Sequence, residues 1–241
     1  MSGMADLELL SAMIISNTWL FRDSGRVFLI DCGHALERPT LALELYRRKL
    51  HRGGLTALLL THRHSDHAGN AAWLRKKTGA PVFCHENDQP ALTGLRKAPS
   101  LSGHGEKGLH ALLCHVEDYL PARSPVDGVY PGRLAEWGFR VIPAFGHTEG
   151  SVMLYHEASA TLFTGDALLT AIPPSRKKER LGLAVTDYSL DVQACHRQTV
   201  DFLRNCPPIR RIAPGHGPLI AQNADAKLEA FLKDPREAIT L

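Results

Sequence analysis

The chain has 241 residues, of which 44% are hydrophobic and 22% are charged, and its formal net charge at pH 7 is +3. This composition is typical of a globular protein with a core of normal size, and it excludes a disordered or fibrous chain. The small charge is spread along the sequence and does not form the dense basic face of a nucleic-acid-binding protein, so we expect no nucleic-acid partner.

The first part of the chain alternates short apolar runs with helical patterns. Apolar runs rich in β-branched and aromatic residues predict strands, whereas apolar residues three and four apart predict helices. On this basis we predict strands over residues 13–21, 26–31, 56–60 and 81–84, and helices over residues 39–50 and 68–78. Residues 22–25 (Arg-Asp-Ser-Gly) indicate a hairpin turn between the first two strands.

Residues 85–131 are less regular and rich in glycine and proline. Leucines and a valine repeat at helical spacing between residues 109 and 120, which predicts one amphipathic helix there. Because long irregular segments often serve as lids, we expect this segment to overhang a site and to shape the choice of substrate. An exposed face of its helix could support a homodimer.

The last part of the chain contains a second group of strands. We predict strands over residues 139–143, 151–155, 161–164 and 209–213, and helices over residues 190–205 and 224–232. Two groups of strands, each with flanking helices, predict an α/β fold in which two sheets pack face to face and helices form the outer layers. Since no low-complexity linker divides the chain, residues 1–241 are predicted to form a single domain.

The cysteines and the N-terminal residues indicate the cellular compartment in which the protein is expected. Five cysteines, far apart and without a CxxC pair, argue against a disulfide framework and fit a reducing compartment. The N-terminus carries Asp6 and Glu8 and lacks the pattern of a signal peptide, and no segment has the length of a transmembrane helix. We therefore expect a cytoplasmic protein with no membrane partner. A basic run at 175–180 is expected to be a solvated loop, with contact to an anionic substrate or a membrane surface as the alternative.

The strongest chemical feature is the segment His62-Arg63-His64-Ser65-Asp66-His67, directly after a predicted strand. In an extended segment side chains two apart lie on one face, so His62 and His64 can bind the same ion, whereas in a helix they would point about 200° apart. Asp66 and His67 follow where the chain turns into the next helix. Imidazole and carboxylate groups suit zinc, and also iron or manganese. Four metal-capable side chains within six residues favour a metal site over a merely hydrogen-bonded polar loop.

Further motifs accompany this segment in a fixed order. They are Ile-Asp-Cys-Gly at 30–33, Gly-His-Thr-Glu-Gly-Ser at 146–151, Thr-Gly-Asp at 164–166 and Gly-His-Gly at 215–217. Together with THRHSDH at 61–67, they resemble the early D-x-G turn and the HxHxDH, GHTxGS, GD and GHG motifs of the metallo-β-lactamase superfamily. The resemblance spans roughly residues 13 to 217 and implies the four-layer αββα sandwich of that family, with its site along one edge.

The resemblance also implies ligands for two divalent metal ions. These ligands are His62, His64 and His147 for one ion, Asp66, His67 and His216 for the other, and Asp166 as the bridge between them. Zinc is favoured, with iron or manganese as alternatives, and no other cofactor is predicted. A second Gly-His-Gly at 103–105 follows no strand, and His104 is therefore expected to be a loop residue. Structural or surface roles are expected for the other histidines, which are His34, His51, His85, His110, His115, His156 and His196.

The chemistry implied by the family is hydrolysis by a hydroxide that bridges the two metals. Paired ions lower the pKa of a shared water and polarise the substrate oxygen. Asp66 is the candidate to orient the hydroxide and to pass its proton to the leaving group. Tyr188 either places its phenol near the substrate oxygen, as a tyrosine does in some lactonases of the superfamily, or packs the start of a helix.

The expected substrate is a small molecule with an ester, thioester or lactone bond. Antibiotic-hydrolysing β-lactamases of this superfamily lack the bridging aspartate, so Asp166 argues against that activity. Glyoxalase II enzymes carry a long helical C-terminal region, whereas 25 residues (241 − 216) follow His216 here. Nucleases of the family carry a further domain or a basic arm, and neither is visible. The alternatives are a mononuclear iron oxidoreductase resembling persulfide dioxygenases, a phosphodiesterase on the same fold, and a non-catalytic metal-binding protein.

Overall fold

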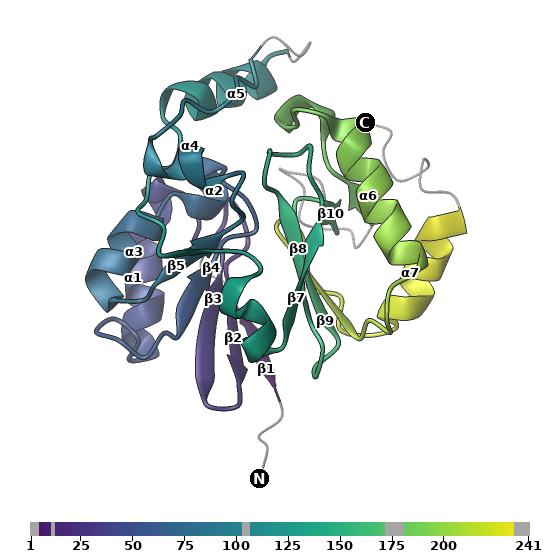
Figure 1. Ribbon diagram of the computed structural model, residues 1–241, viewed down its shortest axis with the longest axis horizontal. Coiled ribbons are helices and arrows are strands. Elements are labelled where there is room, and N and C mark those ends of the chain that lie inside the picture. Colours follow the sequence, from purple (N-terminus) through teal and green to yellow (C-terminus); the bar gives the residue numbers. More distant parts are fainter. Residues whose placement is uncertain (1–4, 11–12, 103–106, 172–180, 234–241) are drawn as a thin grey trace.

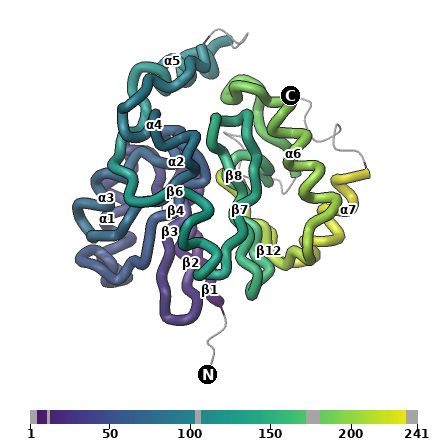
Figure 2. Tube along the Cα trace, in the orientation of Figure 1, coloured from purple at the N-terminus to yellow at the C-terminus, as the bar shows by residue number. Residues whose placement is uncertain are grey.

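Two β-sheets lie face to face in the computed structural model, which describes residues 5–10, 13–102, 107–171 and 181–233. Helices cover the outer side of each sheet, so the molecule is a four-layer αββα sandwich, and the fold predicted from the sequence is confirmed (Figure 1). The first sheet and its helices come from the first half of the chain, and the second sheet and its helices come from the second half (Figure 2).

The first sheet has six strands in the order β1-β2-β3-β4-β5-β6. The strands are β1 (Asp6–Leu9), β2 (Trp19–Asp23), β3 (Arg26–Ile30), β4 (Ala57–Leu59), β5 (Val82–Cys84) and β6 (Gly128–Val129). The first three strands pair antiparallel, and β3 to β6 pair parallel. Since parallel strands end at the same edge of a sheet, the segments that follow β3, β4 and β5 are brought close together there.

The second sheet has four strands in the order β12-β9-β8-β7. The strands are β7 (Phe139–Pro143), β8 (Val152–His156), β9 (Thr161–Gly165) and β12 (Arg211–Pro214), and β10 (Leu168–Leu169) pairs separately with β11 (Gly182–Leu183). Strands β7, β8 and β9 are antiparallel, while β12 runs parallel to β9. The residues after β9 and after β12 therefore also meet at one edge.

Helices α1 (Arg38–Arg47) and α3 (Ala71–Thr78) pack on the outer face of the first sheet, where Leu41, Leu45 and Leu74 join its core. Helices α6 (Val192–Arg204) and α7 (Ala224–Lys233) cover the second sheet (Figure 1). The remaining helices are α2 (Ser65–Ala68), α4 (Gln89–Thr93) and α5 (Leu109–Tyr119), with short 3-10 turns η1 (Ala35–Glu37), η2 (Gly132–Trp137) and η3 (Thr186–Tyr188). No helix within the described residues is long and apolar enough to cross a membrane.

The space between the sheets is filled by aromatic side chains. Phe21 and Phe28 of the first sheet contact Phe139 of the second edge to face, with ring centroids 5.7 Å and 5.3 Å apart. Phe163 lies 5.5 Å from Phe21. Offset and edge-to-face pairs of this kind contribute about 0.5–1.5 kcal/mol each beyond their burial. The two halves are therefore joined by a packed apolar interior.

Several predicted elements differ from the observed ones. The strand predicted over 13–21 begins only at Trp19, because the side chains of Ser16 and Asn17 bond to the turns at Asp66 and Pro214. The helix predicted over 68–78 is divided after Ala68, since the Asn70 amide donates to backbone carbonyls of 32–34. The basic run at 175–180 and His104 lie outside the described residues.

Helix α5 confirms the amphipathic helix predicted between residues 109 and 120, but its apolar stripe faces solvent. Leu109 and Leu112 are 62% and 58% exposed, whereas Cys114 and Glu117 are buried. The helix lies at the margin of the sandwich, away from the sheets (Figure 1). Its inward face therefore carries Cys114 and Glu117 in place of the leucines, whereas an ordinary surface helix buries its leucines.

Candidate metal centre

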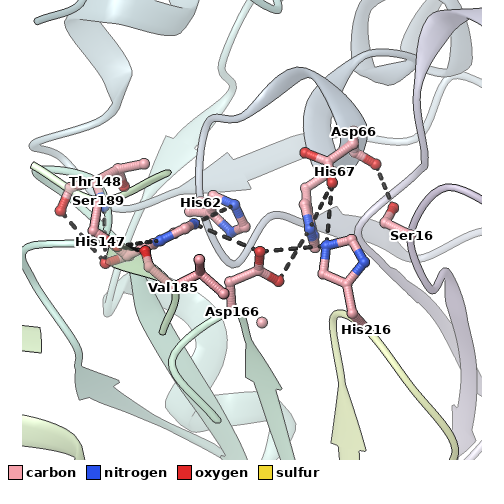
Figure 3. Close-up of polar contacts among 12 residues, drawn as sticks. Ser16, His62, Asp66, His67, His147, Thr148, Asp166, Val185, Ser189 and His216 are labelled. Atoms are coloured by element: carbon pink, nitrogen blue, oxygen red, sulfur yellow. Dashed lines mark hydrogen bonds and ion pairs between the residues drawn. The ribbon is translucent and has the colours of Figure 1, made fainter. Parts of the chain in front are cut away.

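Seven side chains named in the sequence analysis meet at the edge where the strands end. His62 and His64 follow β4, and Asp66 and His67 lie in the short helix α2 that comes next. The other three come from the second half of the chain: His147 from the turn between β7 and β8, Asp166 from the residue after β9, and His216 from the turn after β12. Figure 3 labels all of them except His64 and shows them converging from both sides of the sandwich.

The seven side chains form three overlapping groups that could each hold a metal ion. These groups are His62, His64 and His147; His62, His67 and Asp166; and Asp66, His67 and His216. Within each group the candidate ligand atoms all lie within 4.8 Å of one another. We call the first group the histidine trio and the last the carboxylate trio. Each of these two trios combines residues from both halves of the chain.

Asp166 lies between the two trios. Its Oδ2 is 3.6 Å from His147 Nε2 of the histidine trio and 3.3 Å from His216 Nε2 of the carboxylate trio, and its Oδ1 is 3.2 Å from His67 Nε2. A carboxylate has two oxygens and can therefore serve two neighbouring positions at once. Its placement directly after the buried strand β9 gives it this reach.

Outer hydrogen bonds turn the Nε2 atoms of three histidines inward. His67 Nδ1 lies 2.8 Å from Asp31 Oδ2, and His147 Nδ1 lies 3.0 Å from Ser189 Oγ. His62 Nδ1 lies 3.1 Å from the Thr61 hydroxyl, which itself donates to Asp31. Partners on the far nitrogen fix the orientation of an imidazole that binds metal. These three rings are therefore oriented in advance, with one nitrogen of each facing the cluster.

The histidine trio is electrically neutral at pH 7. Burial lowers the pKa of His62 and His64 well below the ordinary value, and nearby imidazoles lower it further. Burial also lowers the pKa of His147 to about 4. An uncharged imidazole is the form that binds a metal ion, so these rings need not lose a proton first.

The carboxylate trio is a set of opposite charges. Burial raises the pKa of the Asp66 and Asp166 carboxyl groups, but the imidazoles of His67 and His216 outweigh it and hold both values well below the ordinary range. Burial likewise lowers the pKa of His216, yet the two carboxylates outweigh it and raise the value to about 9. Without a metal ion, protonated imidazoles therefore supply the positive charge between these carboxylates.

The cluster meets the chemical requirements of a metal site. His64 Nε2, His67 Nε2 and Asp166 Oδ1 are buried and form no hydrogen bond. Buried polar atoms normally form hydrogen bonds, so three ligand atoms without one in a single cluster indicate that a further group completes it. Nitrogen and carboxylate oxygen ligands suit zinc, iron or manganese. Asp66, whose side chain is 26% exposed, and the less exposed His216 mark the side of the cluster that is open to solvent.

Tyr188 lies outside the three groups but near them. It belongs to η3, one residue before Ser189, whose hydroxyl contacts His147. Its ring lies 5.5 Å from that of His110 on α5. Burial and nearby negative groups, including Asp66, raise the pKa of the phenol to about 12. Tyr188 therefore keeps its proton at neutral pH and can donate a hydrogen bond.

Three residues that orient the ligands were not assigned a role from the sequence. Asp31 appears in the early motif, but its contact with His67 spans 36 positions. Thr61 is adjacent to His62, and Ser189 comes from a turn 42 positions after His147. The motif itself was the only available signal for Asp31 and Thr61, and nothing in the local pattern distinguishes Ser189 from other turn serines.

Comparisons with known proteins agree with this geometry. The sequence profile of the metallo-beta-lactamase superfamily matches residues 13–238. The chain is 28% identical to a probable metallo-hydrolase of Bacillus subtilis, YybB, over 73% of this chain and 70% of that protein. It is 28% identical to a hydroxyacylglutathione hydrolase of Pseudomonas syringae, over 83% of this chain and 69% of that enzyme. Among solved structures it resembles TTHA1623 in a di-iron-bound form, with a TM-score of 0.61 and 28% identity over 89% and 94% of the two chains.

Proposed function

The chain belongs to the metallo-beta-lactamase superfamily, and from this premise we propose that it is a hydrolase that uses two divalent metal ions to cleave an ester, thioester or lactone. The family includes metal-dependent hydrolases similar to this chain. Similarity to these hydrolases does not specify which bond is cleaved or how many metal ions are used, and these two points are our proposal.

The observation that carries the two-ion proposal is the position of Asp166. Its carboxylate contacts imidazoles of both trios, at 3.6 Å for His147 and 3.3 Å for His216. A single ion on one trio would leave the other trio, whose ligand atoms also lie within 4.8 Å of one another, without a metal. Asp166 therefore supports one ion on each trio with a shared carboxylate between them.

The metal ions would be held by the histidine trio and the carboxylate trio, and zinc is favoured, with iron or manganese as alternatives. When bound, such ions lower the pKa of a water molecule between them and polarise the carbonyl oxygen of the substrate. The histidine trio offers neutral ligands and the carboxylate trio offers anionic ones, so together they balance much of the charge of two cations.

We assign the proton transfer to Asp66. Its carboxylate is ionised at neutral pH, and its side chain is on the side of the cluster that is open to solvent. Oδ2 is engaged by His67 at 3.4 Å and by His216 at 3.2 Å, which leaves Oδ1 to accept a proton from the attacking water and deliver it to the leaving group.

Tyr188 is assigned to the substrate oxygen. Its phenol keeps its proton because the pKa is raised to about 12, so it can donate a hydrogen bond to the oxygen on which charge develops. The alternative, a tyrosine that only packs against the lid helix, is compatible with its ring contact to His110. Replacement of Tyr188 separates these two roles.

We propose that residues 85–131 form a lid within a single domain and shape the choice of a small-molecule substrate. Helix α5 of this segment contacts both ligand-bearing halves. Glu117 Oε2 accepts a hydrogen bond from Ser65 N at 2.9 Å in the first half, and His110 Nδ1 lies 2.7 Å from Asp187 Oδ2 in the second half. A helix fixed at both ends beside the site restricts what can approach it.

The decisive experiment is a panel of chromogenic esters, thioesters, lactones and phosphodiesters, assayed with apo protein and with protein reloaded with zinc, manganese or iron. We expect turnover of one carbonyl substrate class, loss of that turnover in the apo protein, and two ions per chain by elemental analysis. Oxygen consumption by protein with one iron per chain would instead identify the oxidoreductase alternative. Turnover of phosphodiesters alone would reject the carbonyl assignment.

A further inference from the structure

Asp88 is a buried carboxylate that lies outside the ligand set. It follows β5, and its side chain is completely buried. Oδ2 accepts a hydrogen bond from the Thr148 hydroxyl at 2.8 Å, and Oδ1 accepts one from Gly150 N at 2.8 Å. Both donors belong to the turn that begins with His147. A buried carboxylate is costly unless it is paired, so these contacts require an explanation.

The segment around Asp88 and the turn at 147–150 are closely packed. A Cβ atom at Gly150 would lie only 2.7 Å from Asp88 N and 2.9 Å from Asp88 Cγ, so only glycine fits there without a shift. Asn87 Nδ2 adds a hydrogen bond to Glu149 O at 3.2 Å. The backbone that carries His147 is thus fixed against residues 87–88 at three successive positions.

On its other side Asp88 faces Arg63, which lies between the ligands His62 and His64. The guanidinium group is 3% exposed, and its Nε is 3.9 Å from Asp88 Oδ1. Arg63 Nε and Nη2 form no hydrogen bond, and among the described residues Asp88 is the carboxylate that forms an ion pair with this buried cation, while Glu117 attracts it more weakly from a greater distance. A buried charge left without a partner costs several kcal/mol, roughly 3–5. Asp88 therefore also acts on the segment that carries the other two histidines.

We propose that Asp88 is a positioning residue for the histidine trio. Its carboxylate joins the 147–150 turn of the second half to the strand-end segment 61–64 of the first half, and so sets the separation of His147 from His62 and His64. The inference goes beyond the proposed hydrolase activity and concerns metal affinity; it rests on the metal site of that proposal but not on the substrate.

Asp31 provides a matched comparison on the other trio. It is also buried, and it contacts His67 Nδ1 at 2.8 Å and the Thr61 hydroxyl at 2.7 Å. It does not contact the 147–150 turn through any bond that the described residues show. Asp31 contacts a carboxylate-trio ligand directly and reaches the histidine trio only through Thr61, whose hydroxyl lies 3.1 Å from His62 Nδ1. Loss of Asp88 should therefore weaken mainly the histidine trio, and loss of Asp31 should weaken the carboxylate trio more than the histidine trio.

The test is a competition titration of the apo full-length chain with Co²⁺ or Zn²⁺ against a chromophoric chelator. We expect Asp88→Ala to weaken one of two binding steps about 10- to 100-fold, the range found when outer partners of metal ligands are removed. The other step should change less than about threefold. Asp31→Asn should weaken the opposite step more strongly than the step weakened by Asp88→Ala, because its effect on His62 passes through Thr61. His147→Ala and His216→Ala show which binding step belongs to which trio, because each removes one ligand from a single trio. The Co²⁺ spectrum of the carboxylate trio should be the same in Asp88→Ala and in His147→Ala.

Two further variants separate positioning from a general loss of stability. Asp88→Asn can still accept from Gly150 N but no longer carries charge toward Arg63, so we expect a smaller loss of affinity than for Asp88→Ala. If Asp88→Ala does not fold, the same metal titration of Asp88→Asn tests the proposal. Glu44→Gln removes a buried carboxylate that pairs with Arg48 on α1, and it should lower the unfolding temperature without changing either binding step.

Several results would overturn the inference. Equal weakening of both steps by Asp88→Ala, in proportion to its loss of stability, would show a merely structural role. Unchanged affinity in all Asp88 variants would also reject it, as would a wild-type chain whose metal binding survives His147→Ala unaltered. If the wild type binds a single ion that His147→Ala abolishes, the two-ion hydrolase proposal fails while the effect of Asp88 on that ion is still decided by the same titration.

Discussion

At the residue scale, Asp88 has a raised pKa of about 6, because burial outweighs the attraction of Arg63 and the hydrogen bonds from Thr148 and Gly150. The ordinary pKa of an aspartate in an unfolded chain is 3.8. The folded state therefore holds this proton more tightly than the unfolded state, and ionisation of Asp88 costs stability as pH rises from about 4 to about 6. The difference of about 2 pKa units corresponds to about 3 kcal/mol.

Asp88→Asn removes this titration. We expect the unfolding free energy of the wild type, relative to Asp88→Asn, to fall by up to about 3 kcal/mol between pH 4 and pH 7. Urea denaturation of both apo proteins at several pH values measures the difference between their unfolding free energies. The histidines are the same in both proteins, so their titration largely cancels in this difference. A difference that is constant, or that grows in favour of the wild type as pH rises, would contradict the burial of an ionisable Asp88.

Tyr188→Phe tests the donor role at the same scale. The phenol is protonated at neutral pH, and removal of one donor to a developing oxyanion costs roughly 100-fold in kcat. We expect such a loss in kcat with a small change in KM and with two ions still bound, since Tyr188 is outside the ligand groups. Steady-state kinetics and elemental analysis on the same sample check this. Unchanged kcat would leave Tyr188 with a packing role beside His110.

At the element scale, the turn after β12 leaves no room for a side chain. A Cβ atom at Gly215 would lie 2.7 Å from His67 Cε1 and 2.9 Å from the carbonyl carbon of Gly165, and it would also meet the Asp166 carboxylate. We therefore expect Gly215→Ala to displace the carboxylate trio and to lower both metal content and activity by at least about 10-fold.

Gly25→Ala is the matched control for Gly215→Ala. Gly25 is in the β2–β3 hairpin with φ of +77°, and no atom lies within 4 Å of its added Cβ. The substitution should therefore cost about 1 kcal/mol of backbone strain and leave metal binding unchanged. Elemental analysis and thermal unfolding of both variants distinguish crowding at the metal site from ordinary glycine strain. Full metal content in Gly215→Ala would show that the turn can shift freely.

The sequence-based predictions succeeded for elements with a strong local pattern. The strand over 139–143 was predicted with its observed bounds, and β3, β4, β8, β9 and α6 were predicted to within a few residues. The elements not predicted were short ones, such as β1, α4 and β6, because a few residues carry too little periodicity and their pairing depends on distant strands. The outward orientation of α5 was also beyond local pattern, since apolar spacing predicts a helix but not the direction of its apolar face.

The candidate site likewise divides into residues that a local motif predicts and residues that only long-range contacts place there. The seven ligand candidates were named because motifs place them directly after strands, and the fold brings those strand ends to one edge. Asp88 and Glu117 were not named, because their contacts with Gly150 and Ser65 join segments more than 50 positions apart. No spacing rule predicts such contacts.

At the scale of the whole molecule, the homodimer expected from the sequence has a candidate contact surface on α5. Its exposed residues include Leu112, Leu113 and Tyr119, and none of its exposed residues is an aspartate, glutamate, lysine or arginine. An uncharged apolar face is complementary to the same face of a second copy across a two-fold axis. Soluble monomers rarely leave large apolar patches uncovered. We therefore propose that a second copy of the chain covers this face.

Leu112→Glu combined with Leu113→Glu tests the dimer. Both leucines are exposed, so the double variant should fold with its stability changed by less than about 1 kcal/mol. Light scattering after size-exclusion chromatography should give a dimeric mass for the wild type and a monomeric mass for the variant. A monomeric wild type at micromolar concentration, or a variant that is still dimeric, would exclude this surface as the contact.

Metal removal tests how the two halves of the molecule are held together. Each trio takes ligands from both halves, so bound ions would join them at the edge of the sandwich, while the aromatic contacts between Phe21, Phe28 and Phe139 join them in the interior. Because that interior does not depend on metal, we expect the chelated protein to remain folded, with an unchanged far-ultraviolet circular dichroism spectrum.

The metal-saturated protein should nevertheless unfold at a higher temperature than the chelated one. One ion present at 100 times its dissociation constant stabilises the folded state by about 2.7 kcal/mol. For a chain of this size such a gain raises the unfolding temperature by about 5–10 °C. Since Asp166 contacts both trios, Asp166→Asn should lose most of this gain, measured against its own chelated form. Calorimetry over a series of free metal concentrations measures the shift in unfolding temperature.

Two outcomes would contradict this account. Complete unfolding on chelation would mean that the aromatic interior is too weak to hold the two halves together, and an unchanged unfolding temperature would mean that no ion joins them.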